Sequence, residues 1–530
     1  MAGTKDKKKG NIEAFKAVAG KISGGKQHLT ATQLRNARKR RAKKQQKHGD
    51  GEARPNLKIS VGSNHSKKST SLTAPDPSAQ YLQRPKSAPL VQVAKRFFAE
   101  HLPKGFQVYQ NGPKTGWRTV SKLPVRKLDK KNKVAIGMFQ PQTHTIAANS
   151  LSGSATTSYP AHHPAINLGI IALTQACQEM GIVPFDETEG TGFLRYVAMN
   201  IERATGKLQM TLIWNDNPYE NLQLELLDAK SKSKKRKRNP QEKLEGQSQL
   251  ERLIIHLVKH FFNSDNARKM AKDQNAAQSN LQIHSLWIHY NATWKHSNAI
   301  FDIQASEASW KHICGPTMIA EQLTDLSKAL PYQPTLHFGP NVFRQANLDA
   351  FAQIVNQIRK RLQQQFPKQT SQPKLLELYG GVGTIGLHLL DLVSSYICSD
   401  ENPYNRPCFQ SSLTSLPNDI SKKANYVPQN ASDMVADSRA FLKSSQVVIV
   451  DPPRKGLEDA VLDALVQAAS NESDRNIELL VYVSCGFDAF QRDFAALTRN
   501  QVWKLEHAEG HVLFPGANAI ETLAFFVPSK

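Results

Sequence analysis

Five short apolar runs in the C-terminal third of the chain alternate with segments of helical spacing. The runs occupy residues 375–378, 395–399, 447–450, 479–483 and 523–527. Before them, apolar residues between Phe351 and Leu362 recur at spacings of three and four, as they do on one face of a helix. Strands that alternate with helices predict a parallel, doubly wound sheet. Ligands bind such sheets at the carboxyl ends of the strands, so the residues that follow each run are candidates for a site.

The chain has 530 residues, more than a single core accommodates, and we divide it into three parts. Residues 1–85 contain few aromatic residues and many Lys, Ser, Gln and Asn, which predicts a disordered basic tail. Residues 86–330 predict an α+β domain on the substrate side, and residues 331–530 predict the doubly wound α/β domain. Within the α+β domain we expect helices at 165–180 and 253–262, strands at 196–215 and 283–290, and a basic loop at 230–245.

The formal net charge of +24 points to a polyanion as partner, and nucleic acid is the natural choice. Residues 1–50 carry 15 Lys and Arg against 3 Asp and Glu, so +12 of this charge lies in the tail. The basic cluster 38–44 is typical of nuclear localisation signals and equally of segments that adhere to RNA. We expect a nuclear or nucleolar protein, with cytoplasm or an organelle as alternatives. The run at 232–238 is a second basic segment suited to RNA contact or import.

Other features exclude several classes of protein. The five cysteines are far apart in sequence and the histidines show no ligand spacing, so we expect neither a disulfide framework nor a metal site. No apolar run reaches the ~18 residues that a membrane span requires, and the N-terminus lacks the apolar core of a secretory signal. We expect a soluble monomer in a reducing compartment.

A glycine-rich turn follows the first apolar run. Gly381, Gly383 and Gly386 satisfy G-x-G-x-x-G, and Asp400 stands at the end of the next strand, where an acid can bind both ribose hydroxyls. The pattern suits NAD and S-adenosylmethionine equally. Asp451, followed by two prolines, distinguishes better between these two classes of enzyme. The two prolines make a rigid turn that leaves the Asp451 carboxylate facing a pocket, and such a turn suits a planar base as substrate. Dehydrogenases have no need of it.

Cys485 ends the fourth run and is the candidate nucleophile. Carbon C5 of uracil or cytosine is a poor nucleophile, but addition of a thiolate to C6 makes C5 reactive toward a sulfonium methyl group. A base must then remove the C5 proton so that the cysteine can leave. Glu521 is the candidate base, since its apolar context would raise its pKa.

The order and spacing of these motifs resemble the RNA uridine-C5 methyltransferases over residues 335–530. The resemblance implies a class I methyltransferase domain, S-adenosylmethionine as cofactor and tRNA or rRNA as substrate. It implies that Cys485 is the nucleophile and Glu521 the general base. The cofactor contacts that it implies are Gln345, Tyr379, Gly381, Gly383, Thr384, Asp400, Asp437 and Asp451.

The chain also departs from the family. Its Ser-Cys-Gly-Phe replaces Ser-Cys-Asn-Pro after the nucleophile, Gly380 replaces a cysteine, and Thr384 replaces a common asparagine. We recognise no N-terminal RNA-binding barrel. The alternatives are a base-amino methyltransferase, an NAD dehydrogenase, and a non-catalytic RNA-binding or ribosome-assembly factor on a methyltransferase fold. Cys408 after Pro407 has the dipeptide typical of RNA cytosine-C5 enzymes, but we interpret it as structural because it follows the second strand in a predicted helix.

Overall fold

The computed structural model describes residues 76–529 apart from positions 77, 104, 129–133, 140–145, 147–158, 188, 216–239, 263–280, 292–308, 324–325, 327–329, 368–371, 438 and 471–475. The basic segments 38–44 and 232–238 lie outside the described residues. Most of the expected tail, residues 1–85, does so too.

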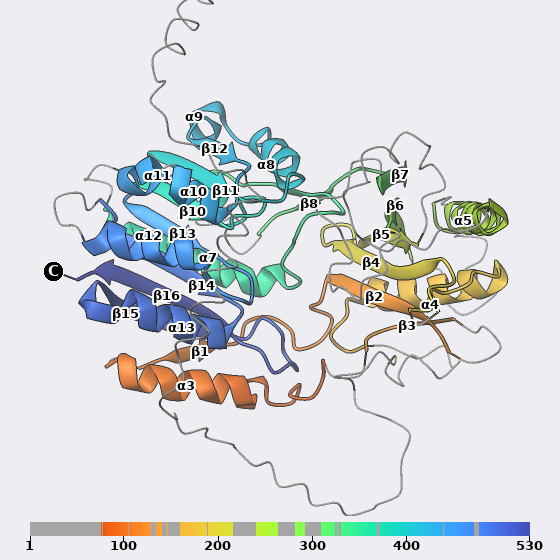
Figure 1. The fold of residues 1–530 in the computed structure, drawn as a ribbon, viewed down its shortest axis with the longest axis horizontal. Helices are drawn as coiled ribbons and strands as arrows, with labels where there is room; N and C mark the ends of the chain where they lie inside the picture. Colours follow the sequence, from red (N-terminus) through yellow and green to blue (C-terminus); the bar gives the residue numbers. More distant parts are fainter. Residues whose placement is uncertain are drawn as a thin grey trace, which may run out of the picture. The chain divides into compact units, whose positions relative to one another are not determined.

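An eight-stranded sheet organises most of the C-terminal part (Figure 1). Its strands, in order across the sheet, are β1 (Gln107–Tyr109), β15 (Trp503–His511), β16 (Glu521–Pro528), β14 (Leu479–Ser484), β13 (Val447–Val450), β10 (Lys374–Leu378), β11 (Ser395–Ser399) and β12 (Ala424–Val427). All neighbours pair in parallel except β16, which is antiparallel to both β14 and β15. The chain leaves central β10 toward β11 and later returns to β13 on its other side, which makes the switch point where such sheets bind ligands.

The strands are apolar throughout because both faces of the sheet are buried. Leu375, Val447 and Leu479 belong to one core, whereas their successors along the strands belong to a second core on the other face. The helices of this part are α3 (Pro89–His101), α7 (Leu348–Gln365), α8 (Asn405–Leu413), α9 (Asn418–Ser421), α10 (Ala431–Asp437), α11 (Arg439–Ser444), α12 (Asp459–Ser470) and α13 (Phe487–Leu497). Helices α7 and α8 cover the first face, and α3 with α10–α13 covers the second (Figure 1). The predicted doubly wound α/β fold is confirmed.

The middle part holds a six-stranded sheet. Across it run β3 (Val134–Ile136), β2 (Val120–Lys127), β4 (Leu194–Glu202), β5 (Lys207–Trp214), β6 (Ile283–Tyr290) and β7 (Trp310–Cys314). Helices α4 (Pro164–Glu179) and α5 (Pro240–Phe261) pack on it and share its core. A two-stranded sheet, β8 (Ile319–Glu321) with β9 (Leu336–Phe338), follows. Short 3-10 helices are η1 (Pro85–Ser87), η8 (Gly386–His388) and η9 (Arg499–Gln501).

The segment that precedes the middle sheet differs from expectation. The sequence assigns residues 86–330 to the α+β domain, but α3 and β1 join the eight-stranded sheet instead. Strand β1 pairs with β15, so that Val108 lies opposite Gly510. The Phe98 ring of α3 packs 5.6 Å from that of Phe490, which lies on α13. Strand pairing and aromatic packing with residues near the C-terminal end of the chain therefore place α3 and β1 in the C-terminal domain.

Two kinds of feature are absent from the described residues. None of their helices combines the length and apolar character that a membrane span needs. Nor do their His, Cys, Asp and Glu side chains gather in groups of three or more that would hold a metal ion.

Candidate active site

Cys485 is the first residue beyond β14, whose six residues are all buried. Gly486 follows at once, before α13 begins. A Cβ atom at Gly486 would come within 2.3 Å of the Arg454 carbonyl oxygen, so glycine is required for the turn after the cysteine to pack on the turn after Asp451. This contact brings two of the predicted motifs together. It also explains why the chain has glycine after Cys485.

Glu521 lies beside Cys485 because β16, which begins at Glu521, runs antiparallel to β14, which ends just before Cys485. In the register of β14 and β16, Ser484 pairs with Thr522, which puts Glu521 next to Cys485 at the carboxyl end of β14. The Glu521 side chain is only 2% exposed, and its Oε1 atom has no hydrogen-bond partner among the described residues. A buried carboxyl oxygen without a partner is costly for stability and is typical of a functional group.

Burial and mutual repulsion raise the pKa values of the acids in this cluster. Burial, with the nearby Glu521 and Asp451 carboxyl groups, raises the pKa of the Cys485 thiol to about 12, and Arg454 opposes this rise. Burial raises the pKa of Asp451 to about 7. For Glu521, burial and Asp451 raise the pKa well above its ordinary value, again against Arg454. Arg454 therefore favours the thiolate and carboxylate forms that chemistry would need.

The glycine turn lies at the ends of β10 and β11. Tyr379, Gly381 and Gly383 have positive φ angles of 58°, 57° and 79°. The Gly381 N–H donates to Asp400 Oδ2 at 3.0 Å, while Oδ1 accepts from the Asn402 N–H at 2.9 Å. The Asp400 carboxylate also forms hydrogen bonds with the Asn405 side chain and the Glu401 backbone, so its position is fixed, and the space where a Gly381 Cβ would point is open. These features fit the ribose and adjoining atoms of an adenosyl cofactor.

Other predicted contacts have different surroundings. The Tyr379 hydroxyl donates to Glu458, a partner that the sequence analysis missed although it stands seven positions after Asp451. Thr384 is partly buried, and its carbonyl oxygen lies 2.8 Å from His388 Nδ1. Asp437 is the last residue of α10, and its side chain lies outside the described residues. Glu377 is buried inside the turn, where it accepts from the Gly386 N–H at 3.0 Å, a structural contact.

Gln345 stands at the junction with the middle sheet. Its neighbour Arg344 is buried and donates to the Ile201 and Thr119 carbonyl oxygens at 2.8 and 2.9 Å. On the other side, the Ala346 carbonyl accepts from the Thr119 N–H at 2.9 Å. The backbone around Gln345 is therefore fixed by the middle domain rather than by the large sheet.

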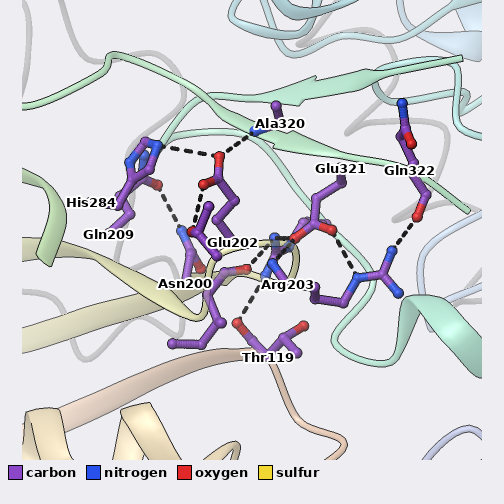
Figure 2. Close-up of polar contacts among 12 residues, drawn as sticks. Thr119, Asn200, Glu202, Arg203, Gln209, His284, Ala320, Glu321 and Gln322 are labelled. Atoms are coloured by element: carbon purple, nitrogen blue, oxygen red, sulfur yellow. Dashed lines mark hydrogen bonds and ion pairs between the residues drawn. The ribbon is translucent and has the colours of Figure 1, made fainter. Parts of the chain in front are cut away.

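A buried carboxylate completes this junction. Glu321 is 3% exposed and accepts from Arg344 at 2.7 Å and from Arg203 Nε at 2.8 Å. Figure 2 shows Arg203 and the Glu321 carboxylate facing each other, with Thr119 close by. Arg203 also pairs with Asp349, at the start of α7. No sequence motif marks these residues, because their partners are distant in the chain.

Known proteins were then compared with the chain. The scan of protein-family models found no match. An uncharacterized RNA methyltransferase of Protochlamydia amoebophila is 26% identical over 79% of this chain and 88% of its own length. A second one, from Halalkalibacterium halodurans, is 20% identical over 78% of this chain and 72% of its own. The predicted resemblance to RNA methyltransferases is confirmed.

The fold agrees with this resemblance. A tRNA (uracil-54, C5)-methyltransferase of Pyrococcus abyssi, solved in complex with S-adenosyl-L-homocysteine, matches with a TM-score of 0.51. The match covers 83% of each chain at 17% sequence identity. Most of this RNA methyltransferase homologue therefore shares the fold of the P. abyssi protein. The ligand of the P. abyssi enzyme agrees with the predicted cofactor.

Proposed function

We propose that the protein forms 5-methyluridine in RNA, with tRNA or rRNA as substrate and S-adenosylmethionine as methyl donor. The observation that carries the proposal is the adjacency of Cys485 and the unpartnered buried carboxyl of Glu521 at the carboxyl end of β14. A nucleophile and a base side by side are what methylation of a pyrimidine at C5 requires. Transfer to an exocyclic amine requires no such cysteine.

The reaction divides between these two residues. Cys485 gives its proton to solvent and its thiolate bonds to C6 of uracil, which makes C5 an enolate carbon. This carbon would then accept the electrophilic methyl group that a bound S-adenosylmethionine would supply. Glu521, as the carboxylate, takes the C5 proton, the C6–S bond breaks and the electron pair returns to sulfur. Arg454 assists at two points, because its charge favours both the thiolate and the Glu521 carboxylate.

The cofactor would be held by the turn after β10 and by Asp400. When bound, it supplies a methyl group made electrophilic by a sulfonium charge. The open face of Gly381 lets the backbone approach a ligand closely, and Asp400, whose carboxylate the Gly381 N–H fixes, is the acid that would contact the ribose. Asp451, at the end of β13, lies between this turn and Cys485, since β13 pairs with both β10 and β14.

The cytosine-C5 alternative receives no support from Cys408. That cysteine is buried within α8, and its Sγ accepts from the Gly339 N–H at 3.3 Å. Burial raises its pKa to about 11. It is a packing residue on the face of the sheet covered by α7 and α8.

Trapping of the covalent intermediate tests the proposal. Wild-type protein, Cys485→Ala and the control Cys314→Ala are incubated with 5-fluorouridine-substituted RNA and S-adenosylmethionine. Fluorine at C5 cannot leave as a proton, so wild type and control should accumulate a protein–RNA adduct that survives denaturation, and Cys485→Ala should not. RNA that binds wild type without any adduct would contradict uridine-C5 chemistry and favour an amino-methyltransferase or a non-catalytic factor.

Glu521→Gln separates the second step from the first. With ordinary RNA this variant should accumulate the adduct and release methylated product about 10²–10⁴-fold more slowly, because the C5 proton has no acceptor. Product analysis by nucleoside mass spectrometry measures the rate. A variant that turns over at the wild-type rate would remove Glu521 from the mechanism.

A further inference from the structure

A basic cavity lies outside the catalytic cluster, at the start of the described chain. Its volume is about 400 Å³, and Arg84, Lys86 and Lys114 line it together with the amide side chains of Gln83, Gln92 and Gln110. None of its lining residues is acidic. Amides and cations together offer many hydrogen-bond donors, which suits an anionic ligand.

The three cations have no counter-charges. Across the described parts of the chain, Arg84, Lys86 and Lys114 form no ion pair, and all three side chains are exposed. The one contact that holds any of these charged groups is between Lys114 Nζ and the Gln83 carbonyl oxygen, at 3.2 Å. Three like charges around one hollow repel one another, and an anion that enters it would relieve this repulsion.

The walls of the cavity are tied to the loop that leads into the catalytic base. The Tyr81 N–H donates to the Gly516 carbonyl at 2.9 Å, and the Leu90 N–H donates to Asn518 Oδ1 at 2.8 Å. Gly516 itself must be glycine, since a Cβ there would lie 2.2 Å from the Ser78 carbonyl oxygen. The segment around η1 thus rests on the loop that ends at Glu521.

Strand β1, which precedes Gln110 and Lys114, also connects the cavity wall to the segment between β15 and β16. The Val512 N–H donates to the Tyr109 carbonyl at 2.9 Å, next to Gln110 in the cavity wall. Strand β1 runs parallel to β15, so its carboxyl end lies at the edge of the sheet where Cys485 and Glu521 lie (Figure 1). The cavity and the catalytic cluster therefore lie toward the same edge of the sheet.

We propose that this cavity binds a backbone phosphodiester of the RNA substrate, and so sets the register in which a uridine reaches Cys485. The proposal rests on the proposed function. Contacts to phosphate and sugar position a protein on nucleic acid without reading its sequence, and a volume of this size accommodates such a unit. The cavity thus supplies a substrate contact outside the catalytic cluster.

The test replaces Arg84, Lys86 and Lys114 with Gln in the full chain. Binding of total tRNA and of rRNA is measured across a salt series, beside a control variant in which Lys360, Arg499 and Lys504 become Gln. The control residues are exposed cations toward the opposite edge of the sheet, so both variants lose the same charge. Thermal unfolding and S-adenosyl-L-homocysteine binding check that both variants fold and keep the cofactor site.

The cavity variant should bind RNA about tenfold more weakly, and the slope of log K against log salt should become shallower by about 1, as expected for the loss of one phosphate contact, whereas the affinity of the control should change less than twofold. Equal weakening in both variants, or none in the cavity variant, would overturn the proposal. Adduct formation on 5-fluorouridine RNA by wild type is scored separately. If wild type forms no adduct but the cavity variant alone loses RNA, the proposed function fails and the cavity stands.

Discussion

At the residue scale, the environment of Cys485 predicts an unusual reactivity. With a pKa of about 12, the thiol is almost entirely protonated at neutral pH, so alkylation by iodoacetamide should be slow and should rise about tenfold per pH unit from pH 7 to 10. An unperturbed cysteine would instead level off near its pKa of about 8.5. Peptide mass spectrometry of the Cys485 peptide measures the rate at each pH.

Arg454 supplies the matched control for that experiment. Arg454→Gln removes the cation that opposes the raised pKa of Cys485, so alkylation at a given pH should become slower still. A wild-type profile that saturates below pH 9, or an Arg454→Gln variant that reacts faster, would contradict this account of the site. The sequence predicted Cys485 and Glu521 as partners from motif order, but it could not show that the Arg454 backbone packs on Gly486.

At the scale of elements, the sequence predicted what is continuous and apolar. Strands β10, β13 and β14 are buried on both faces and read directly as apolar runs. It missed β15, in which Lys504, Glu506 and His507 interrupt the pattern, and β1, a three-residue strand that exists only through its pairing with β15. Pairing between such distant segments leaves no local signal, which is why α3 and β1 were assigned to the wrong domain.

The junction around Glu321 gives a prediction at the same scale. Glu321→Gln removes the charge that Arg344 and Arg203 share in a buried place, and it should lower the free energy of unfolding by about 3 kcal/mol. Asp349→Asn breaks only the ion pair with Arg203. Because the Asp349 side chain is 53% exposed, this substitution should lower the free energy of unfolding by less than about 1 kcal/mol. Urea denaturation of the two variants compares them. Equal losses would mean that burial of the Glu321 pair is not what stabilises the junction.

At the scale of the whole molecule, charge and chemistry are separate in the sequence. Half of the formal net charge, +12 of +24, lies in residues 1–50, whereas Cys485, Glu521 and the glycine turn belong to one sheet far along the chain. Electrostatic affinity of a basic segment is independent of base sequence and falls with salt. The tail is therefore expected to raise the occupancy of RNA on the protein, while the proposed phosphodiester site at Arg84, Lys86 and Lys114 is expected to determine where that RNA lies.

The basic tail is predicted to affect the affinity for RNA and not the rate of methyl transfer. Replacing the six Lys and Arg of residues 38–44 with Gln in the full chain should raise the KM for RNA and flatten its salt dependence. The single-turnover rate of methyl transfer at saturating RNA should stay within twofold of wild type, because no catalytic group is touched. Rapid-quench measurement at several RNA concentrations separates the two quantities. If the rate at saturation fell as steeply as the affinity, the tail would be acting on the bound complex, and the division between capture and positioning would be wrong.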